Sequence, residues 1–289
     1  MKRIFEVAGG TIIGRNHKET NKNNQDAFFW EVKNEVIAAV VCDGCSAGKT
    51  SEIGAKLSSK FIARLLTKKT FLFKNRKMAN CTGGEFPFWD WIRYDISLWL
   101  FDIAQKIGYS LEAVIKDYFL FSIIGALITR EETVLFSLGD GLIIVNGEVI
   151  QIGPFPNNEP PYIAYNLIDS SFSTTNPELL TFQIHRLMLT RDIKSILIGS
   201  DGIADLIKKE KSIVPGKIEE VGPISQFWEN NRYFSNPDMI RRKLALINRD
   251  HVKIIRDKQS MVSDIKRENG LLTDDTTFVV IRRKQEEGG

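Results

Sequence analysis

The stretch that decides the fold is VIAAVVCDG, residues 36–44. Its first six residues, Val36 to Val41, are all apolar and lack the polar alternation of a strand with one face in water. We therefore expect a strand that is buried on both faces. The strand runs directly into Asp43 and Gly44, so a carboxylate stands at the end of a rigid apolar segment.

The same form recurs along the chain, with an acidic motif at one end of a strand-like apolar run. The motifs are NQDA, GDG, SDG and TDDT, and they contain Asp26, Asp140, Asp201 and Asp274. Carboxylates and backbone carbonyls are the ligands that hard divalent cations prefer. The pattern predicts an oxygen-lined site for such cations, although any single Asp-Gly pair is more often a turn.

Composition places the chain among ordinary globular proteins. It has 289 residues, of which 43% are hydrophobic and 26% are charged, and we expect one domain over residues 1–289. A net charge of +3 and a pI near 8.6 are too mild to indicate binding to nucleic acid or to an anionic membrane. No apolar run approaches the roughly 20 residues that span a bilayer.

The cysteines favour a reducing compartment. Three cysteines cannot form a full disulfide framework, and the first residues do not have the pattern of a secretory signal, so we expect a cytoplasmic protein. Cys42 and Cys45 form a Cys-x-x-Cys pair, for which a zinc or redox role is the alternative. Because no further ligands follow at motif spacing, we interpret them as small apolar thiols beside Asp43.

Strands and helices alternate in blocks. Apolar periodicity predicts helices over residues 51–66, 87–107, 111–118, 203–208 and 238–250. Strands are expected over residues 121–129, 133–138, 142–146, 148–153, 179–184, 195–199 and 277–282, and loops over 67–84 and 154–161. Asn146-Gly147 predicts a tight hairpin. The order favours an α+β domain whose last strand completes the sheet that the first strands begin.

The motifs, taken in this order, resemble those of the metal-dependent protein serine/threonine phosphatases of the PP2C type, the PPM family. The resemblance spans nearly the whole chain and includes the early Gln-Asp, the two Asp-Gly motifs, the Gly-Asp motif and the terminal Asp-Asp-x-Thr. Residues 14–17, 51–55 and 158–162 are similar to a divergent bacterial subgroup. The resemblance implies a four-layer α-β-β-α sandwich, with two central antiparallel sheets flanked by helices and a metal site at one end.

What the resemblance implies for the metals is specific. Asp43 would bridge two Mn²⁺ or Mg²⁺ ions and the Gly44 carbonyl would bind one of them. Asp201 and Asp274 would complete the ligand set of the second ion, and Asp26 would lie close by, in contact with the metals partly through water. Asp140, together with Asp201, would hold a third, weaker ion. Asp43 and Asp201 therefore count as catalytic. Asp275 is left outside the ligand set, and Asp205 is interpreted as a helix-face residue.

The phosphate contact departs from the family. Its usual arginine, five positions before the early aspartate, is replaced here by Asn21. Candidates for the contact in the same loop are Arg15, His17, Lys18 and Lys22. A lysine would not be equivalent, because an ammonium acts as a point charge and a guanidinium binds phosphate bidentately. His17 could also act as general acid to the leaving oxygen, against the alternative of a structural histidine.

The leading hypothesis is a cytoplasmic phosphatase that hydrolyses phosphoserine or phosphothreonine on proteins with a water activated by two metal ions. A cognate Ser/Thr kinase is the expected second partner. One alternative is a catalytically silent module that keeps the fold and binds a phosphoprotein, which the missing arginine favours. The other is a small-molecule phosphohydrolase with the same metals. The sequence leaves open the physiological substrate, the choice between Mn²⁺ and Mg²⁺, and the oligomeric state.

Overall fold

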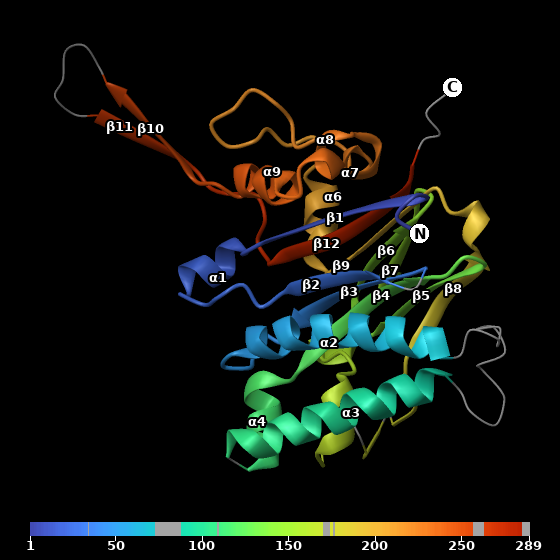
Figure 1. Cartoon of the computed structure of the whole chain (residues 1–289). Coiled ribbons are helices and arrows are strands. Elements are labelled where there is room, and N and C mark those ends of the chain that lie inside the picture. Colours follow the sequence, from blue (N-terminus) through green and yellow to red (C-terminus); the bar gives the residue numbers. More distant parts are fainter. Residues whose placement is uncertain are drawn as a thin grey trace, which may run out of the picture.

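The structure is a computed structural model that describes residues 1–33, 35–72, 88–108, 110–169, 174–175, 177–256 and 263–284. Two antiparallel sheets of five strands lie face to face at its centre (Figure 1). The first sheet has the strand order β1 (Phe5–Ile12), β12 (Thr276–Arg283), β9 (Ser195–Gly199), β6 (Gly141–Val145) and β7 (Glu148–Ile152). The second has the order β2 (Ala27–Lys33), β3 (Val36–Gly44), β4 (Phe121–Ile128), β5 (Glu132–Leu138) and β8 (Gln183–Leu189).

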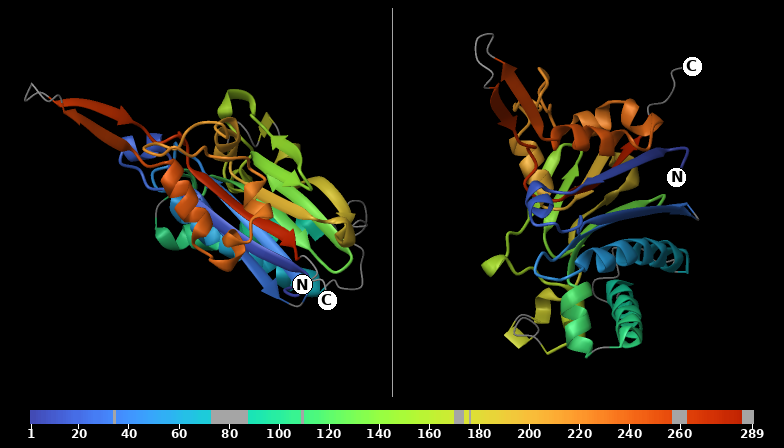
Figure 2. Two further views of the ribbon diagram at one scale, coloured as in Figure 1. Left: turned by 90° about the horizontal axis from the view of Figure 1, so that it is seen from above. Right: turned by 90° about the vertical axis from the view of Figure 1, so that its left-hand side faces the viewer.

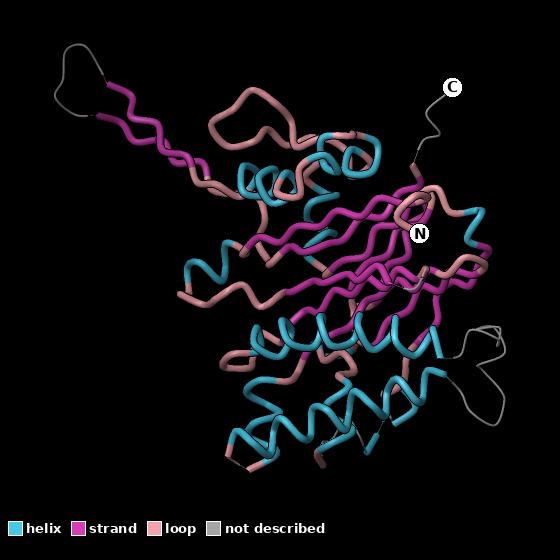
Figure 3. The backbone as a smooth tube through the Cα atoms, in the orientation of Figure 1, coloured by secondary structure: helices cyan, strands magenta, loops and turns pink. Residues whose placement is uncertain are grey.

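Helices cover the outer face of each sheet, which Figure 3 shows as separate helical and strand layers. The outer face of the second sheet carries α2 (Ser51–Leu72), α3 (Phe88–Ile107) and α4 (Leu111–Tyr118). The outer face of the first carries α6 (Gly202–Lys208), α7 (Gln226–Glu229), α8 (Arg232–Ser235) and α9 (Met239–Ile247). The short α1 (Arg15–Glu19) follows β1. The α+β class agrees with the order of elements predicted from the sequence, and the four layers are those that the family resemblance implied.

Three apolar cores separate the four layers, and β3 contributes to two of them. Ile37, Ala39 and Val41 pack between the sheets, while Ala38 and Val40 face the helices of the second sheet. All of these side chains are fully buried. The strand is therefore buried on both faces, as its unbroken apolar run predicted. A third core lies between the first sheet and helices α6 to α9.

Most predicted elements are present, with three exceptions. Residues 67–72 continue α2 instead of forming a loop, and residues 73–84 of that predicted loop lie outside the described residues. The strand predicted at 179–184 begins at Gln183. The last strand, β12, pairs with β1 and β9 and not with β3, because β3 belongs to the other sheet.

An unexpected hairpin lies within the polar segment 209–269. Strands β10 (His251–Arg256) and β11 (Ser263–Glu268) pair only with each other and project away from the sandwich, beyond α1 (Figure 2). Val252 and Ile265 leave 53% and 55% of their surface in solvent. An isolated two-stranded hairpin is marginally stable in water, so its placement depends on contacts at its base.

Asn248 lies just before the β10–β11 hairpin and is only 1% exposed. Its side-chain amide donates to the Ile13 carbonyl (2.8 Å), and its side-chain oxygen accepts from the Leu272 N–H (3.0 Å). The Lys18 ammonium donates to its backbone carbonyl at 2.8 Å. One residue thus connects α9 to the segments that lead into α1 and into Asp274.

We expect Asn248→Ala to lower the free energy of unfolding by about 2–3 kcal/mol, because two largely buried backbone groups lose their partners. Asn248→Asp should cost less, since a carboxylate still accepts from Leu272. Urea unfolding measures both, with the exposed Gln105→Ala on α3 as control. A loss at Asn248 no greater than that at Gln105 would contradict the assignment.

Candidate metal centre

The strand ends of both sheets meet at one end of the sandwich, where they bring the five predicted aspartates together. In one sheet Asp26 precedes β2 and Asp43 is the next-to-last residue of β3. In the other, Asp201 follows β9 and Asp274 precedes β12. Asp140 lies in the crossing from β5 to β6. Segments far apart in the sequence thus contribute carboxylates to one place.

The charges of these aspartates act on one another, which shows in the pKa of Asp43. Burial is the largest cause that raises the pKa of Asp43 well above its ordinary value. The negative charges of the other four aspartates, Asp26, Asp201, Asp140 and Asp274, raise that pKa further. Asp43 is therefore at the centre of the cluster.

Asp26 is the most deeply buried member, at 2% exposure. Burial and then the charge of Asp275 raise its pKa well above the ordinary value. The Ser200 hydroxyl donates to its Oδ2 at 2.7 Å, and the Thr277 N–H donates to that hydroxyl at 3.1 Å. The SDG motif therefore contributes through Ser200 as well as through Asp201: it fixes the orientation of a carboxylate from the opposite sheet.

Asp140, Asp201 and Asp274 line a cavity of about 230 Å³. Burial, followed by the charges of Asp274 and Asp140, raises the pKa of Asp201 to about 6. Burial also raises the pKa of Asp274. Both side chains are open to the cavity, but its walls exclude part of the surrounding water. The Ser122 hydroxyl of β4 donates to Asp140 Oδ1 at 2.5 Å.

Gly44 has a packing reason to be glycine. A Cβ at this position would lie 2.8 Å from both the Gln25 carbonyl oxygen and the Ser51 hydroxyl, which is closer than real Cβ contacts. The Gly44 N–H donates to that Gln25 carbonyl at 3.2 Å. The residue before Asp26 and the residue after Asp43 are thereby held in direct contact, and this brings the two motifs of the second sheet together.

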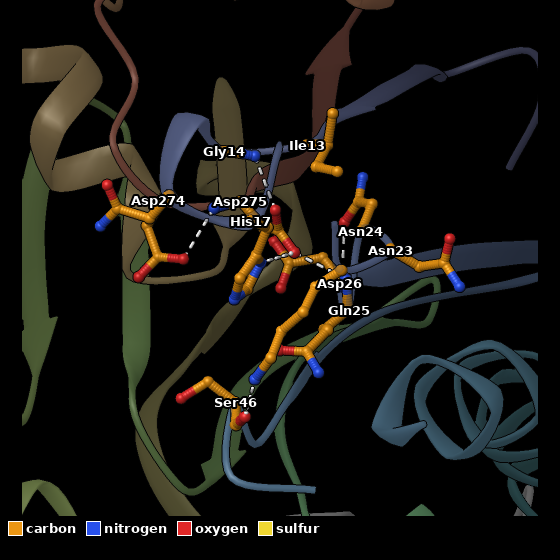
Figure 4. A network of polar contacts seen from close by, with 12 residues as sticks. Ile13, Gly14, His17, Asn23, Asn24, Gln25, Asp26, Ser46, Asp274 and Asp275 are labelled. Carbon is orange, nitrogen blue, oxygen red and sulfur yellow. Dashed lines mark hydrogen bonds and ion pairs between the residues drawn. The ribbon is translucent and has the colours of Figure 1, made fainter. Parts of the chain in front are cut away.

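Asp275 is a buried connector of three segments (Figure 4). Its Oδ1 accepts from the Gly14 N–H and its Oδ2 from the Gln25 N–H, each at 2.6 Å. His17 Nδ1 lies 2.9 Å from Oδ2. His17, Asp274 and Asp275 offer potential ligand atoms within 4.8 Å of one another. Because a backbone donor binds each oxygen of Asp275, we assign this residue a positioning role.

The cations predicted to bind phosphate are engaged elsewhere. Lys18 and Lys22 donate to the backbone carbonyls of Asn248 and Ser46, and Arg15 approaches the Gly270 carbonyl at 3.5 Å. Neither these three residues nor His17 is among those that line the cavity. The structure thus brings the predicted aspartates together, but it does not place the predicted phosphate-binding residues on the cavity wall.

Asp205 was interpreted from sequence as a helix-face residue, yet it also lines the cavity. It accepts a hydrogen bond from the Thr273 hydroxyl, and its charge raises the pKa values of Asp201 and Asp274. The signal in the sequence was its spacing: residues four apart lie on the same side of a helix, so Asp205 follows Asp201 onto the cavity side.

This donor set fits a divalent cation. The described side chains of the cluster offer oxygen atoms only, and their mutual repulsion, together with burial, raises the pKa of Asp26, Asp43, Asp201 and Asp274. A cluster of that kind gains most from a bound positive charge. Asp43, Asp201 and Asp274, with the Gly44 carbonyl, are the residues that would hold the ions.

Replacing the connector tests its positioning role. Asp275→Ala should lower the free energy of unfolding by about 3 kcal/mol, because two buried N–H groups lose their acceptor. Asp275→Asn should cost roughly half as much, since the amide keeps one acceptor oxygen. Urea unfolding in EDTA measures the effect without metal, with the exposed Asp192→Ala as control. Equal stability of Asp275→Ala and the parent would refute the role.

The raised pKa of Asp201 predicts a pH dependence. Between the unfolded pKa of about 3.9 and the folded value of about 6, the folded chain binds more protons. The unfolding free energy of the metal-free protein therefore includes a contribution that falls across this window and is constant above it. Asp201→Asn removes that contribution, so the variant should gain stability over the parent as the pH rises from about 4 to about 6.

Urea unfolding in EDTA, measured from about pH 4 to about pH 8, checks this expectation. The difference between variant and parent isolates Asp201 from the other titrating groups. A difference that stays constant with pH would show that folding does not perturb this carboxyl.

Helices in the described part of the chain include none that is long and apolar enough to cross a membrane. A search of curated proteins found no match to the sequence. Among solved structures, a bacterial serine phosphatase aligns over 98% of this chain and 100% of its own, with 16% identity and a TM-score of 0.52. A variant of a bacterial serine phosphatase with one arginine replaced by lysine has 17% identity and a TM-score of 0.51 over 98% and 100% of the two chains.

The serine/threonine phosphatase Stp1 from Staphylococcus aureus has 16% identity and a TM-score of 0.49 over 97% of this chain and 96% of that one. At such identities the two bacterial serine phosphatase structures show a shared fold and no more. The sequence itself carries the stronger finding, since the model of the protein phosphatase 2C family matches residues 13–233. With the sandwich and the aspartate motifs in the order described above, the chain belongs to the protein phosphatase 2C family.

Proposed function

We propose that the protein is a metal-dependent phosphatase that hydrolyses phosphoserine or phosphothreonine on proteins. The observation that carries the proposal is the convergence of five aspartates from both sheets, in which the charges of the other four all act on Asp43. Clustered carboxylates destabilise a fold unless a cation offsets them, so their presence supports a metal-binding role. Membership of the phosphatase family supports the reaction.

In this proposal Asp43, Gly44, Asp201 and Asp274 would hold two Mn²⁺ or Mg²⁺ ions, and Asp140 with Asp201 would hold a third. When bound, the ions would supply positive charge that lowers the pKa of the attacking water and offsets the charge developing on the phosphoryl group. Ser200 orients Asp26, and Ser122 orients Asp140, through the hydrogen bonds described above. Asp275 fixes the backbone next to Asp274, so that this carboxylate is positioned before any ion binds.

His17 as a general acid stays a prediction. Its Nδ1 lies against Asp275, which supports a part in positioning this loop. The remaining ring nitrogen, Nε2, is the atom that would donate a proton to a leaving oxygen if the residue acts as an acid.

The activity test uses p-nitrophenyl phosphate with added Mn²⁺. Asp43→Asn and Asp201→Asn should each lower kcat/KM by roughly 100-fold or more, because each removes an anionic ligand from the proposed ion-binding site. The exposed Asp192→Asn serves as the matched control and should leave the rate unchanged. Full activity in either site variant would refute the assignment.

One observation favours the silent binding module as the second candidate. Asn21 occupies the position of the family's phosphate-binding arginine, and the nearby cations make contacts with the protein instead. Isothermal titration with Mn²⁺ separates the candidates: micromolar binding without turnover of any phosphopeptide supports the module. A panel of phosphopeptides and small phosphate esters then distinguishes a protein phosphatase from a small-molecule phosphohydrolase. A cytoplasmic location and a partner kinase belong to the same proposal.

A further inference from the structure

The cavity beside the candidate metal centre has a distinctive charge distribution. Its walls carry four carboxylates, those of Asp140, Asp201, Asp205 and Asp274. Among the described residues that line it, Lys208 is the only cation. A phosphate monoester carries close to two negative charges at neutral pH. Even with ions bound to the carboxylates, such a substrate gains from a cationic contact on this wall.

Lys208 is the last residue of α6, the helix that begins directly after Asp201. Its ammonium lies 3.5 Å from Asp205 Oδ1, and 72% of its side chain is exposed. An exposed ion pair of this length contributes little to stability, so Lys208 can leave Asp205 for a substrate at small cost. The other oxygen of Asp205 accepts from the Thr273 hydroxyl, which keeps that carboxylate in place.

Neutral groups also line the cavity. They come from Gln151 of β7 and from Pro154 and Asn158 in the segment that follows β7. The side-chain amides of Gln151 and Asn158 can donate hydrogen bonds to a phosphate oxygen or to a peptide carbonyl. At about 230 Å³ the cavity is smaller than a typical ligand pocket, a size that suits a phosphorylated side chain rather than a longer peptide segment.

The cations of the loop before Asp26 are less suited to this task. Lys18 and Lys22 would each have to break a hydrogen bond to a backbone carbonyl, and neither lines the cavity. Lys208 would give up only an exposed 3.5 Å contact with the Asp205 carboxylate. The two positions also differ in the fold, since Lys208 belongs to α6, which follows β9 of the first sheet, whereas Asn21 precedes β2 of the second.

We propose that Lys208 provides the cationic contact to the substrate phosphate that Asn21 cannot make. This inference rests on the proposed function, in which the cavity admits a phosphorylated side chain. Lys208 is then a substrate-binding residue and takes no part in holding the ions. As a point charge on a flexible stem, it fixes the phosphate less rigidly than a bidentate guanidinium does.

The decisive measurement is binding of inorganic phosphate to the full chain in Mg²⁺, by isothermal titration, next to steady-state kinetics with a phosphopeptide. Lys208→Ala should weaken phosphate binding and raise KM by roughly 5-fold each, with kcat and Mg²⁺ affinity unchanged. Lys208→Glu should have a larger effect in the same direction, and Lys208→Arg should restore binding. The neighbouring exposed Lys209→Ala, which does not line the cavity, is the matched control.

The outcomes separate this inference from the proposed function. If the parent turns over substrate but Lys208→Ala binds phosphate as the parent does, the inference about Lys208 is wrong and the phosphatase stands. If the parent shows no turnover and Lys208→Ala binds phosphate more weakly than the parent, the phosphate contact is supported. The silent binding module is then favoured over the phosphatase. A parent that neither binds phosphate nor turns over substrate overturns both. A change in Mg²⁺ affinity in Lys208→Ala would reassign the residue to the metal centre.

Discussion

The constraint on which the rest of the structure depends is the repulsion among carboxylates gathered at one end of the sandwich. The charges of Asp26, Asp201, Asp140 and Asp274 all raise the pKa of Asp43, so the metal-free cluster opposes its own assembly. The opposing force comes from three apolar cores, which fix the strands that carry these residues. The fold thus provides the rigidity that a charged site cannot provide for itself.

Rigid strands alone do not position the loops between them. Asp275, the residue after Asp274, connects the segment before α1 to the residue before Asp26, because its carboxylate accepts from the backbone N–H groups of Gly14 and Gln25. Asn248 acts in the same way at the end of α9. Its side chain ties α9 and the base of the β10–β11 hairpin to Ile13 and Leu272, in the segments that lead into α1 and Asp274. These hydrogen bonds tie the site to the surrounding fold. Substitution of either residue should therefore change both the free energy of unfolding and the binding of metal ions.

Elements that depend on interactions between residues close in the sequence could be predicted, and elements that depend on distant residues could not. The buried strand over residues 36–44, the hairpin turn at Asn146-Gly147 and the helices α3 and α4 are determined by local patterns and were predicted closely. Strands β1 and β2 and the β10–β11 hairpin were missed. The pairing of β1 lies with distant residues, and that of β10 with β11 lies within a polar segment. Asp205 was missed as a member of the site because its helix position has meaning only next to Asp201 and Thr273.

The sequence by itself determined the fold class and the family, because apolar periodicity and ordered short motifs can be read directly from the residues. It also predicted five of the clustered aspartates, but not the place of Asp205 beside them. The tertiary structure decided which side chains share a cavity. It placed Arg15, His17, Lys18 and Lys22 off the cavity wall and Lys208 on it, although Lys208 belongs to no motif. The physical reason is that an ammonium interacts strongly only with the charged groups close to it. Which groups are close is decided by the packing of the two sheets and not by position along the chain.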